Sequence, residues 1–417
     1  MKSLELFSGA GGFAKGLELA GFDHAGFVEF NKHAAASLNA NFDENKVYFG
    51  DIREYDFDQL SNIDVVAGGP PCQPFSLGGL HKAFDDDRDM FPYAIKAIEK
   101  LSPKAFIFEN VKGLLRQSFS SYFDYIIMRL TFPDFPIKDD MKWSDCLKLL
   151  KSIDYNQYRG NKYYVQYKIL NAANFGVPQS RERVIIVGIR ADTGLTWHYP
   201  EPTHTEERLL WDQYVTNNYC DRHNINRSLL SMGNYLPNDN KIARLKRVYG
   251  LFPPESKPWQ TVRDVIGDVP HPETNHGIPD HVFRDGARSY PGHTGSPFDW
   301  LAKTIKAGGH GVPGGENMIR YHDGSIRYFT TYEAKLIQTF PKRFIIKGEW
   351  GETLRQIGNA VPVVLAERLG QSLKALLDSP SQKSCPTIAS IPHAPVKHPQ
   401  RRVDSNRVPE SVTATLL

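Results

Sequence analysis

The sequence predicts an α/β protein whose sheet is doubly wound, with helices on both faces. Short apolar runs with the length of buried strands recur in the first half of the chain, at residues 3–8, 24–30, 64–69, 105–110 and 183–190. Segments with the apolar spacing of helices lie between the first four of them, at residues 11–22, 31–42 and 90–101. Near-continuous apolar strands that alternate with helices are typical of a parallel sheet covered on both sides.

The composition is that of a globular protein without a membrane span or a disulfide framework. The chain has 417 residues, of which 41% are hydrophobic and 23% charged, and this length is enough for two domains. The formal net charge of +3 fits a polyanionic partner without requiring one. Four scattered cysteines contain no CxxC pair, so we expect neither disulfides nor zinc, and a reducing compartment. No apolar run approaches the roughly 20 residues that span a bilayer, and the N-terminus has no signal-peptide core.

The rest of the chain divides into a second domain, a late helix and a tail. The region from Trp197 to Glu349 is rich in Pro, Gly, His and Asn, which predicts an irregular, loop-rich domain built to contact a partner. Within it, the basic stretch at 241–250 could bind phosphates or form a solvated helix face. Residues 361–377 have the apolar spacing of a helix. Beyond Asp378 the chain is polar and Pro-rich, so we expect disorder there.

The segment LELFSGAGGF (4–13) has the order strand, glycine turn and helix. Its glycines at 9, 11 and 12 allow the backbone to approach a ligand closely. Glu29 ends the second predicted strand, where a carboxylate can bind the hydroxyl groups of a ribose, and Asp51 follows the next short strand. This pattern indicates an adenosine-containing cofactor. By itself it also fits a nicotinamide dinucleotide or a plain glycine-rich turn.

A single cysteine stands between prolines directly after the predicted strand at 64–69, in the segment GGPPCQPFS (68–76). Loops at the carboxyl ends of parallel strands are where doubly wound folds bind ligands. Pro70, Pro71 and Pro74 restrict the backbone of this loop, because each fixes its own φ and limits the residue before it. A cysteine is often only a small buried hydrophobe, but a rigid loop at this edge predicts that Cys72 is a nucleophile.

Two further segments place polar side chains at the same edge of the sheet. Glu109 ends the strand at 105–110, and a partly desolvated carboxyl group can act as a proton donor. Arg181 and Arg183 lie two positions apart at the start of the last strand, so their side chains point to the same side. Taken singly, Glu109 could be a helix cap or an ion-pair partner, and the arginines an exposed pair. One thiol, one carboxyl group and two guanidinium groups at one edge indicate a catalytic site.

Eight segments, taken together, resemble the DNA cytosine-5 methyltransferase family, in particular its compact members that accompany bacterial restriction systems. They occur in the family's order and cover nearly the whole chain apart from the tail. They are LELFSGAGGF (4–13), FVEFNKHA (27–34), GDIRE (50–54), GGPPCQPFS (68–76), FENV (108–111), QSRERV (179–184), RYFTTYEAKLIQTFP (327–341) and QIGNAVPVVLAERLG (356–370). The Pro-Cys-Gln loop followed by Glu-Asn-Val and Gln-x-Arg-x-Arg is the specific part of this resemblance, whereas the glycine loop alone is not.

The resemblance implies a doubly wound mixed sheet of the S-adenosylmethionine-dependent methyltransferase type, with a smaller irregular target-recognition domain. Residues 1–196 and 352–378 would form the catalytic and cofactor-binding domain, residues 197–351 the target-recognition domain, and residues 379–417 a disordered tail. The catalytic domain would be discontinuous because the family's last helix folds back onto the first strand.

The resemblance also implies a reaction, in which a methyl group passes from S-adenosylmethionine to carbon 5 of a cytosine that has rotated out of the duplex, leaving S-adenosylhomocysteine. The Cys72 thiolate would add to carbon 6, Glu109 would donate to ring nitrogen 3, and Arg183 would hold oxygen 2. Arg181 and Arg183 would favour the thiolate by their charge. The implied cofactor-binding residues are Phe7, Ser8, Gly9, Gly11, Gly12, Phe13, Glu29, Phe30, Asp51, Ile52, Pro71, Asn359 and Val361. The implied DNA-binding residues are Gln73, Ser76, Lys303, Thr304, Ile305, Lys306, Gly308, Gly309 and His310.

Double-stranded DNA is the partner that the resemblance implies, with a cognate restriction endonuclease as a functional counterpart. We expect a bacterial, cytoplasmic monomer that is associated with the nucleoid through DNA and uses no metal and no membrane. Two other interpretations stay open, an enzyme that methylates cytosine in transfer RNA and a catalytically inactive DNA-binding regulator. The long region between Trp197 and Glu349 favours DNA over transfer RNA, and the intact Cys72, Glu109 and Arg183 argue against an inactive regulator.

Overall fold

The structure is a computed structural model that describes residues 1–71, 89–138, 140–232, 237–291, 293–307 and 317–379. Residues Met1–Gln382 form one compact unit. The predicted domain boundaries within this unit stay predictions.

The strands and helices of the described residues follow in chain order. The strands are β1 (Lys2–Leu6), β2 (Asp23–Glu29), β3 (Val47–Phe49), β4 (Val65–Gly68), β5 (Ala105–Val111), β6 (Tyr163–Asn171), β7 (Glu182–Arg190), β8 (His204–Thr205), β9 (Lys257–Pro258), β10 (Ser296–Pro297), β11 (Met318–Arg320) and β12 (Ile326–Tyr328). The α-helices are α1 (Gly12–Leu19), α2 (Lys32–Asn39), α3 (Phe91–Leu101), α4 (Ser120–Thr131), α5 (Trp143–Lys151), α6 (Glu206–Leu210), α7 (Asn218–His223), α8 (Ser228–Met232), α9 (Asp239–Tyr249), α10 (Val262–Ile266), α11 (Thr331–Ile337), α12 (Trp350–Asn359) and α13 (Val363–Asp378).

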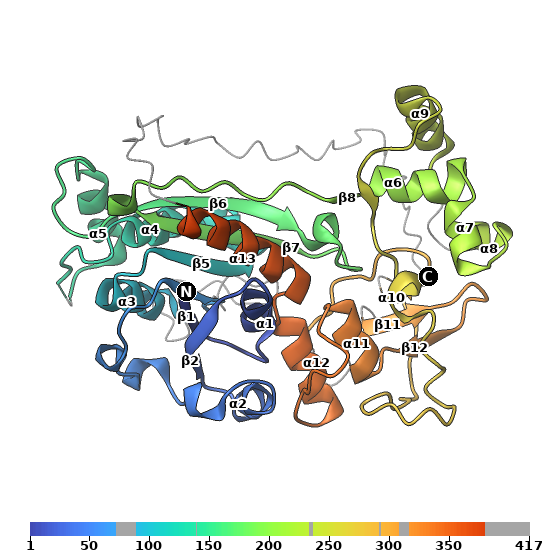
Figure 1. Cartoon of the computed structure of the whole chain (residues 1–417), viewed down its shortest axis with the longest axis horizontal. Coiled ribbons are helices and arrows are strands. Elements are labelled where there is room, and N and C mark those ends of the chain that lie inside the picture. Colours follow the sequence, from blue (N-terminus) through green and yellow to red (C-terminus); the bar gives the residue numbers. More distant parts are fainter. Residues whose placement is uncertain (72–88, 139, 233–236, 292, 308–316, 380–417) are drawn as a thin grey trace, which may run out of the picture. The chain divides into compact units, whose positions relative to one another are not determined.

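Seven strands form one mixed sheet in the order β3-β2-β1-β4-β5-β7-β6 (Figure 1). The strands from β3 to β5 are parallel, whereas β7 runs antiparallel to both β5 and β6. The predicted α/β class and mixed sheet are confirmed, and all five predicted strands are present. The sequence analysis did not predict β6. This strand lies at the sheet edge with most of its side chains partly exposed, so YYVQYKILN lacks the continuous apolar run of a buried strand.

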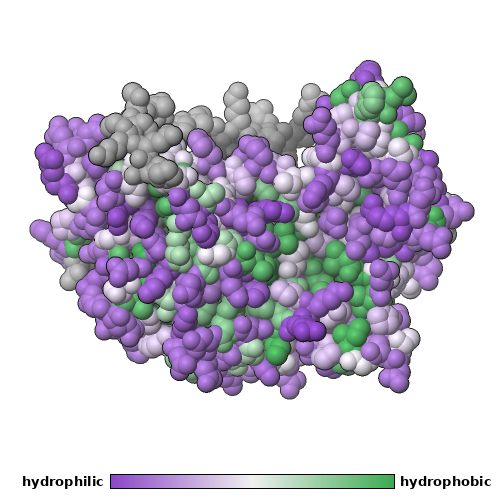
Figure 2. Space-filling view, in the orientation of Figure 1, coloured by the Kyte–Doolittle hydropathy of each residue, from purple (hydrophilic) through white to green (hydrophobic). Residues whose placement is uncertain are grey.

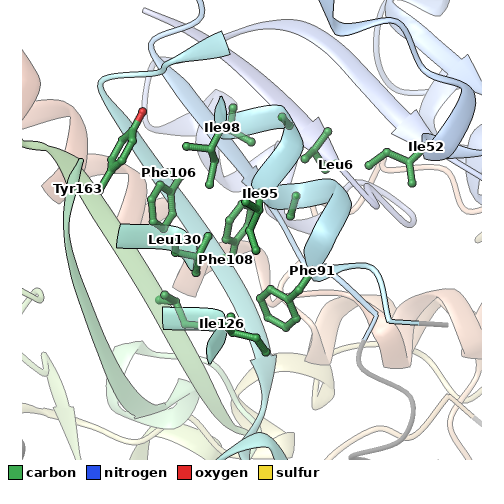
Figure 3. Close-up of a cluster of buried hydrophobic side chains, with 14 of the residues drawn as sticks. Leu6, Ile52, Phe91, Ile95, Ile98, Phe106, Phe108, Ile126, Leu130 and Tyr163 are labelled. Carbon is green, nitrogen blue, oxygen red and sulfur yellow. The ribbon is translucent and has the colours of Figure 1, made fainter. Parts of the chain in front are cut away.

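Helices cover both faces of the sheet. On one face, α3 and α4 pack against β1, β4 and β5 in the larger hydrophobic core. Figure 3 shows Ile95 and Ile98 of α3 and Leu130 of α4 beside Phe106 and Phe108 of β5, and all five side chains are buried. Burial of each such side chain contributes about 1.5–3 kcal/mol relative to exposure. This core therefore holds the carboxyl ends of β4 and β5, which lead into the predicted catalytic loops, in a fixed position.

On the opposite face, α13 lies against α1, although the two helices are far apart in the sequence. Small residues permit the close approach. A Cβ atom at Gly16 would lie 2.4 Å from the Cβ of Ala366, and one at Gly370 would lie 2.8 Å from the Cβ of Ala20. The helix predicted at 361–377 is thus confirmed, and it returns to the first strand–helix unit. The segment that precedes α13 is brought to the glycine loop by this packing.

The region between Trp197 and Glu349 consists of short elements and long connections. Two small sheets, β8-β9 and β10-β11-β12, lie among helices of which the longest is α9. This matches the irregular, loop-rich character that the composition predicts. Among the described residues, no helix has the length and hydrophobicity needed to cross a membrane.

Glu5 of β1 is a charged residue inside the sheet. Its side chain is fully buried, and neither carboxylate oxygen has a hydrogen-bond partner among the described residues. Burial raises the pKa of Glu5 to about 8, because an unpaired carboxylate is poorly stabilised away from water. The group is therefore largely protonated at neutral pH.

Candidate active site

The carboxyl ends of β1, β2 and β3 bring the predicted cofactor residues to one edge of the sheet. The strands are held in register beyond their last residues, because the Ser8 amide donates to the Val28 carbonyl at 3.2 Å and the Gly50 amide to the Glu29 carbonyl at 3.1 Å. The loop at residues 7–13, Glu29 and Asp51 consequently lie side by side. The order of these residues in the sequence, each after a predicted strand, predicts that they share one edge. The parallel pairing of the three strands brings them there.

The glycine loop has a backbone that side chains would obstruct. Gly9 and Gly11 have φ values of +55° and +86°, in the left-handed region that glycine adopts without strain. Phe7 adopts a φ of +53°, an uncommon value for an aromatic residue. At Gly12 a Cβ atom would lie 2.5 Å from the Val361 carbonyl oxygen, so only glycine allows the two segments to meet. The loop thus joins the predicted cofactor residue Val361 from the far end of the chain.

Glu29, the last residue of β2, is hydrogen-bonded to the glycine loop. Its carboxylate accepts hydrogen bonds from the backbone amides of Gly9 at 2.6 Å and Asn31 at 2.7 Å. Burial raises the pKa of Glu29, and the two backbone donors oppose that rise. Glu29 is only 9% exposed, so its carboxylate is largely shielded from bulk solvent.

Asp51 and two aromatic residues complete this edge. The Asp51 carboxylate accepts from Arg53 Nε at 2.9 Å and from its backbone amide at 2.9 Å, and these bonds lower the Asp51 pKa. Phe30, a predicted residue, is 72% exposed, and Phe49, which the sequence analysis missed, is 60% exposed at the end of β3. Ile52 is buried in the hydrophobic core.

These residues fit an adenosyl cofactor. Two carboxylates can accept from ribose hydroxyl and adenine amino groups, and two exposed aromatic rings offer faces to a purine. A Cβ atom at Gly9 would meet no other atom within 4 Å, so the loop borders open space at that position.

Glu109 and Arg183 form an ion pair at the neighbouring edge. The Arg183 Nε lies 2.6 Å from Glu109 Oε1, and the side chains are only 13% and 9% exposed. Antiparallel pairing of β5 with β7 sets Val111 opposite Arg183, which places Arg183 and Glu109 diagonally on one face. The predicted association of a carboxyl group with a guanidinium group at this edge is therefore present.

The chain that leads to Cys72 approaches the same pair. A Cβ atom at Gly69 would lie 3.4 Å from Glu109 Oε2, and the Asn110 side-chain amide donates to the Pro70 carbonyl at 2.9 Å. Pro71 is exposed, and its carbonyl accepts from the Met90 amide at 3.3 Å, so both ends of the intervening segment are held together. Cys72, Gln73 and Ser76 themselves lie outside the described residues.

Arg181 has a different environment from Arg183. Its side chain is 1% exposed, and its terminal nitrogens donate to the backbone carbonyls of Ile305, Gly358 and Ala360. Burial and the nearby Arg183 lower the Arg181 pKa well below its usual range. No ion pair to Arg181 is present in the part of the chain that the structure describes.

The predicted recognition residues lie beside Arg181. Thr304 donates from its hydroxyl to the Ser180 carbonyl at 2.6 Å, and Lys303 Nζ donates to the Thr294 hydroxyl at 3.1 Å. Ile305 is 1% exposed, and its side chain packs in a hydrophobic cluster that anchors this segment. The predicted residues Gly308, Gly309 and His310, which follow Ala307, lie outside the described residues.

The helix α9 is basic, and exposed apolar residues lie at its carboxyl end. We call Val248, Leu251 and Phe252 the α9 tip; their exposed fractions are 62%, 93% and 79%. Figure 2 shows hydrophobic side chains on the surface over α9. Arg244 and Arg247 on this helix are exposed and form no ion pair with another described residue. The basic stretch predicted at 241–250 is thus a helix with one anchored apolar side and an exposed cationic side.

Comparison with known proteins decides the family. The profile described as C-5 cytosine-specific DNA methylase matches residues 1–375. The chain belongs to this family. The predicted family and enzyme class, DNA (cytosine-5-)-methyltransferase, are therefore confirmed.

Relatives of this DNA methylase cover most of its length. It is 30% identical over 393 residues to type II methyltransferase M.NgoFVII of Neisseria gonorrhoeae, an alignment that covers 92% of this chain and 88% of the relative. It is 32% identical over 304 residues to type II methyltransferase M.NgoMIV of the same organism, an alignment that covers 72% of this chain and 87% of the relative. The S. pombe Dnmt2 methyltransferase structure superposes with a TM-score of 0.53 at 15% identity, covering 91% of this chain and 100% of that one, which shows the shared fold.

Proposed function

We propose that this DNA methylase transfers a methyl group from S-adenosylmethionine to carbon 5 of a flipped-out cytosine within a specific duplex sequence, through a covalent Cys72 adduct. The observation that carries this proposal is the largely buried Glu109–Arg183 ion pair at 2.6 Å, beside the strand end that leads to Cys72. A carboxyl group and a guanidinium group at that position can neutralise charge on a pyrimidine while a thiolate adds to it.

The chain's own residues account for activation of the base. The Cys72 thiolate forms a bond to carbon 6, and the displaced electron pair moves toward ring nitrogen 3, where the protonated form of the Glu109 carboxyl group donates a proton or hydrogen bond. Arg183 donates to oxygen 2 and holds the Glu109 carboxyl group in place. S-adenosylmethionine supplies the electrophilic methyl group that carbon 5 accepts. Loss of the carbon-5 proton to a base then expels the Cys72 thiolate and restores the aromatic ring.

The cofactor would lie along the edge formed by β1, β2 and β3. Glu29 would bind the ribose hydroxyl groups, Asp51 the adenine amino group, and Phe30 would lie against the purine ring. Asn359 and Val361 would border the methionine end, because Val361 meets the glycine loop at Gly12.

The target base must leave the duplex before this chemistry, at a cost of a few kcal/mol. The segment from Lys303 to Lys306 and the glycine-rich loop after it would read base edges in the major groove. Arg244 and Arg247 of α9 would bind phosphates and so add salt-dependent affinity. The relatives are type II methyltransferases, so we propose that methylation protects host DNA from a cognate restriction endonuclease.

The test is to express the chain in cells that lack cytosine methylation and to map 5-methylcytosine in their plasmid DNA by bisulfite conversion. We expect methylation at one cytosine of a short recurring sequence. A plasmid without 5-methylcytosine, from cells that contain the folded protein, would contradict the proposal.

Two measurements test the covalent route. Cys72→Ala should abolish methyl transfer and leave DNA binding intact, because the substitution removes only the nucleophile. Duplex DNA with 5-fluorocytosine at the mapped position should form a covalent adduct with the wild-type protein, since the fluorine cannot leave as a proton does. Methylation by Cys72→Ala at the wild-type rate, or no adduct during turnover, would exclude the thiolate step.

A further inference from the structure

Three buried polar side chains form a hydrogen-bonded cluster. Gln179 and Arg181 come from the connection between β6 and β7, and Gln338 comes from the end of α11. Their exposed fractions are 0%, 1% and 0%. We refer to them as the polar cluster.

The cluster bonds to the segment that enters the predicted recognition loop. Arg181 Nη1 donates to the Ile305 carbonyl at 3.3 Å, and the Ile305 amide donates to the Gln179 side-chain oxygen at 3.1 Å. One residue later, Asn317 holds both backbone groups of Lys306, at 3.0 Å each. These bonds fix the backbone of residues 305 and 306. We call residues 305–307, which precede the predicted recognition loop, the loop base.

The cluster also bonds to the junction between α12 and α13, which contains two predicted cofactor residues. Arg181 Nη2 donates to the carbonyls of Gly358 at 2.7 Å and Ala360 at 3.0 Å. Gln338 donates to the Ile357 carbonyl at 2.6 Å and accepts from Gln179 at 3.1 Å. These bonds fix the backbone on both sides of Asn359.

The loop base and the junction also touch directly. A Cβ atom at Gly358 would lie 2.5 Å from the Ala307 amide nitrogen, so the two backbones approach closer than any side chain would permit. A shift of the loop base must therefore move either the junction or the polar cluster between them.

Burial of Arg181 in this environment is expected to add little to the stability of the fold. Arg181 is buried without a carboxylate partner in the described chain, and its Nε has no hydrogen-bond acceptor there. A buried charge held only by carbonyls is often less stabilising than an apolar side chain of similar volume. One of the three carbonyls that accept from Arg181 belongs to the loop base and two belong to the junction. This distribution indicates that Arg181 connects the loop base to the junction.

We propose that Arg181, supported by Gln179 and Gln338, is a positioning residue that couples DNA binding at the loop base to cofactor binding at Asn359. The inference rests on the proposed function, because it takes DNA and S-adenosylmethionine as the ligands of these two segments. DNA contacts that shift the loop base also shift the Ile305 carbonyl, and the guanidinium group passes this shift to the Gly358 and Ala360 carbonyls of the junction. By linkage, the cofactor strengthens DNA binding by the same factor.

The experiment measures binding without turnover. The dissociation constant of radiolabelled S-adenosylhomocysteine is determined by equilibrium dialysis, for the protein alone and for the protein saturated with linear plasmid DNA that lacks cytosine methylation. The ratio of the two constants is the coupling factor, which we expect to be about 10 for the wild-type protein. Arg181→Met should bring it to about 1, because methionine keeps the apolar volume and loses every donor. Arg181→Lys should retain part of the coupling, since an ammonium group can still reach some of the carbonyls.

Arg327→Met is the matched control. Arg327 is also buried in this part of the chain, but it pairs with Glu333 at 2.6 Å and bonds to neither the loop base nor the junction. Its loss should destabilise the protein and leave the coupling factor unchanged. Gln338→Leu provides a second test if Arg181→Met does not fold, and it should lower the coupling factor in the same direction.

The outcomes separate the two proposals. A wild-type coupling factor of 1, or a wild-type factor retained in folded Arg181→Met or Gln338→Leu, overturns the role of the polar cluster. Loss of coupling in Arg327→Met to the same extent also overturns it, because the effect would then follow from general destabilisation. A wild-type protein that binds neither S-adenosylhomocysteine nor DNA refutes the proposed function itself.

Discussion

Replacement of Arg183 tests two roles of its side chain. One is to stabilise the folded protein by pairing with Glu109, and the other is to donate to the reacting base. Its Nε lies 2.6 Å from Glu109 Oε1, and the two side chains are 13% and 9% exposed. Removal of one partner from a buried ion pair leaves the other charge uncompensated, which costs about 3–5 kcal/mol. Because both groups keep some exposure at the sheet edge, we expect Arg183→Met to lower the free energy of unfolding by about 3 kcal/mol.

The same substitution removes a donor from the reacting base. Loss of one preorganised donor to developing charge typically lowers kcat by about 10²–10³. The double variant Glu109→Gln/Arg183→Met places two neutral side chains of similar size in the same space. It should regain most of the lost unfolding free energy and none of the lost activity.

Urea denaturation and single-turnover methylation with radiolabelled cofactor measure these two effects separately. If the double variant is as unstable as Arg183→Met, the unpaired carboxylate is not the cause of the instability. If Arg183→Met methylates DNA at the wild-type rate, Arg183 does not act on the cytosine.

Three further predictions concern the cofactor loop, the sheet interior and the basic helix. Gly12→Ala should weaken S-adenosylhomocysteine binding by at least about tenfold in calorimetry, since its Cβ would lie 2.5 Å from the Val361 carbonyl; unchanged affinity would contradict this. Burial raises the pKa of Glu5 to about 8, so the folded protein retains a proton that the unfolded chain releases, and the free energy of unfolding should fall as pH rises from about 4.5 to about 8. Glu5→Gln should abolish that fall and add about 5 kcal/mol above pH 8, as pH-dependent urea denaturation can measure, and an unaltered pH profile would refute it. Arg244→Gln and Arg247→Gln should each reduce the slope of log affinity against log salt by about 0.9 in DNA-binding titrations, and an unchanged slope would show that α9 binds no phosphates.

Much of the catalytic half could be predicted from short-range patterns. The strand at 105–110 is continuously apolar and ends in Glu109, so its position at the rim follows from the rule that parallel strands share an edge. The glycine loop follows from similar reasoning, since Gly9 and Gly11 do adopt left-handed φ values. The edge strand β6 could not be predicted, because a strand that is half exposed lacks the apolar run on which the prediction depends.

The roles of Arg181 and Arg183 show the limit of strand periodicity. Their spacing of two predicts a common side, and it does not say what each side chain meets. Arg183 reaches Glu109 of β5, whereas Arg181 precedes β7 and bonds to carbonyls at 305, 358 and 360. Gln179 and Gln338 lie in segments that carry the family resemblance, and Asn317 lies in none of them. The sequence does not show what these amide groups bond to, because their partners lie far along the chain.

The sequence by itself determined the family, the order of the buried strands with the loops that follow them, and which residue types reach the edge of the sheet, since these depend on local periodicity and motif. Only the tertiary structure decided which distant backbones meet. The contacts of Gly12 with Val361 and of Gly358 with Ala307 depend on how helices pack, and a glycine looks the same in the sequence whether it serves a turn or a close approach. Packing of α13 on α1 brings Val361 to Gly12, whereas Arg181 is buried between the loop base and the junction of α12 with α13.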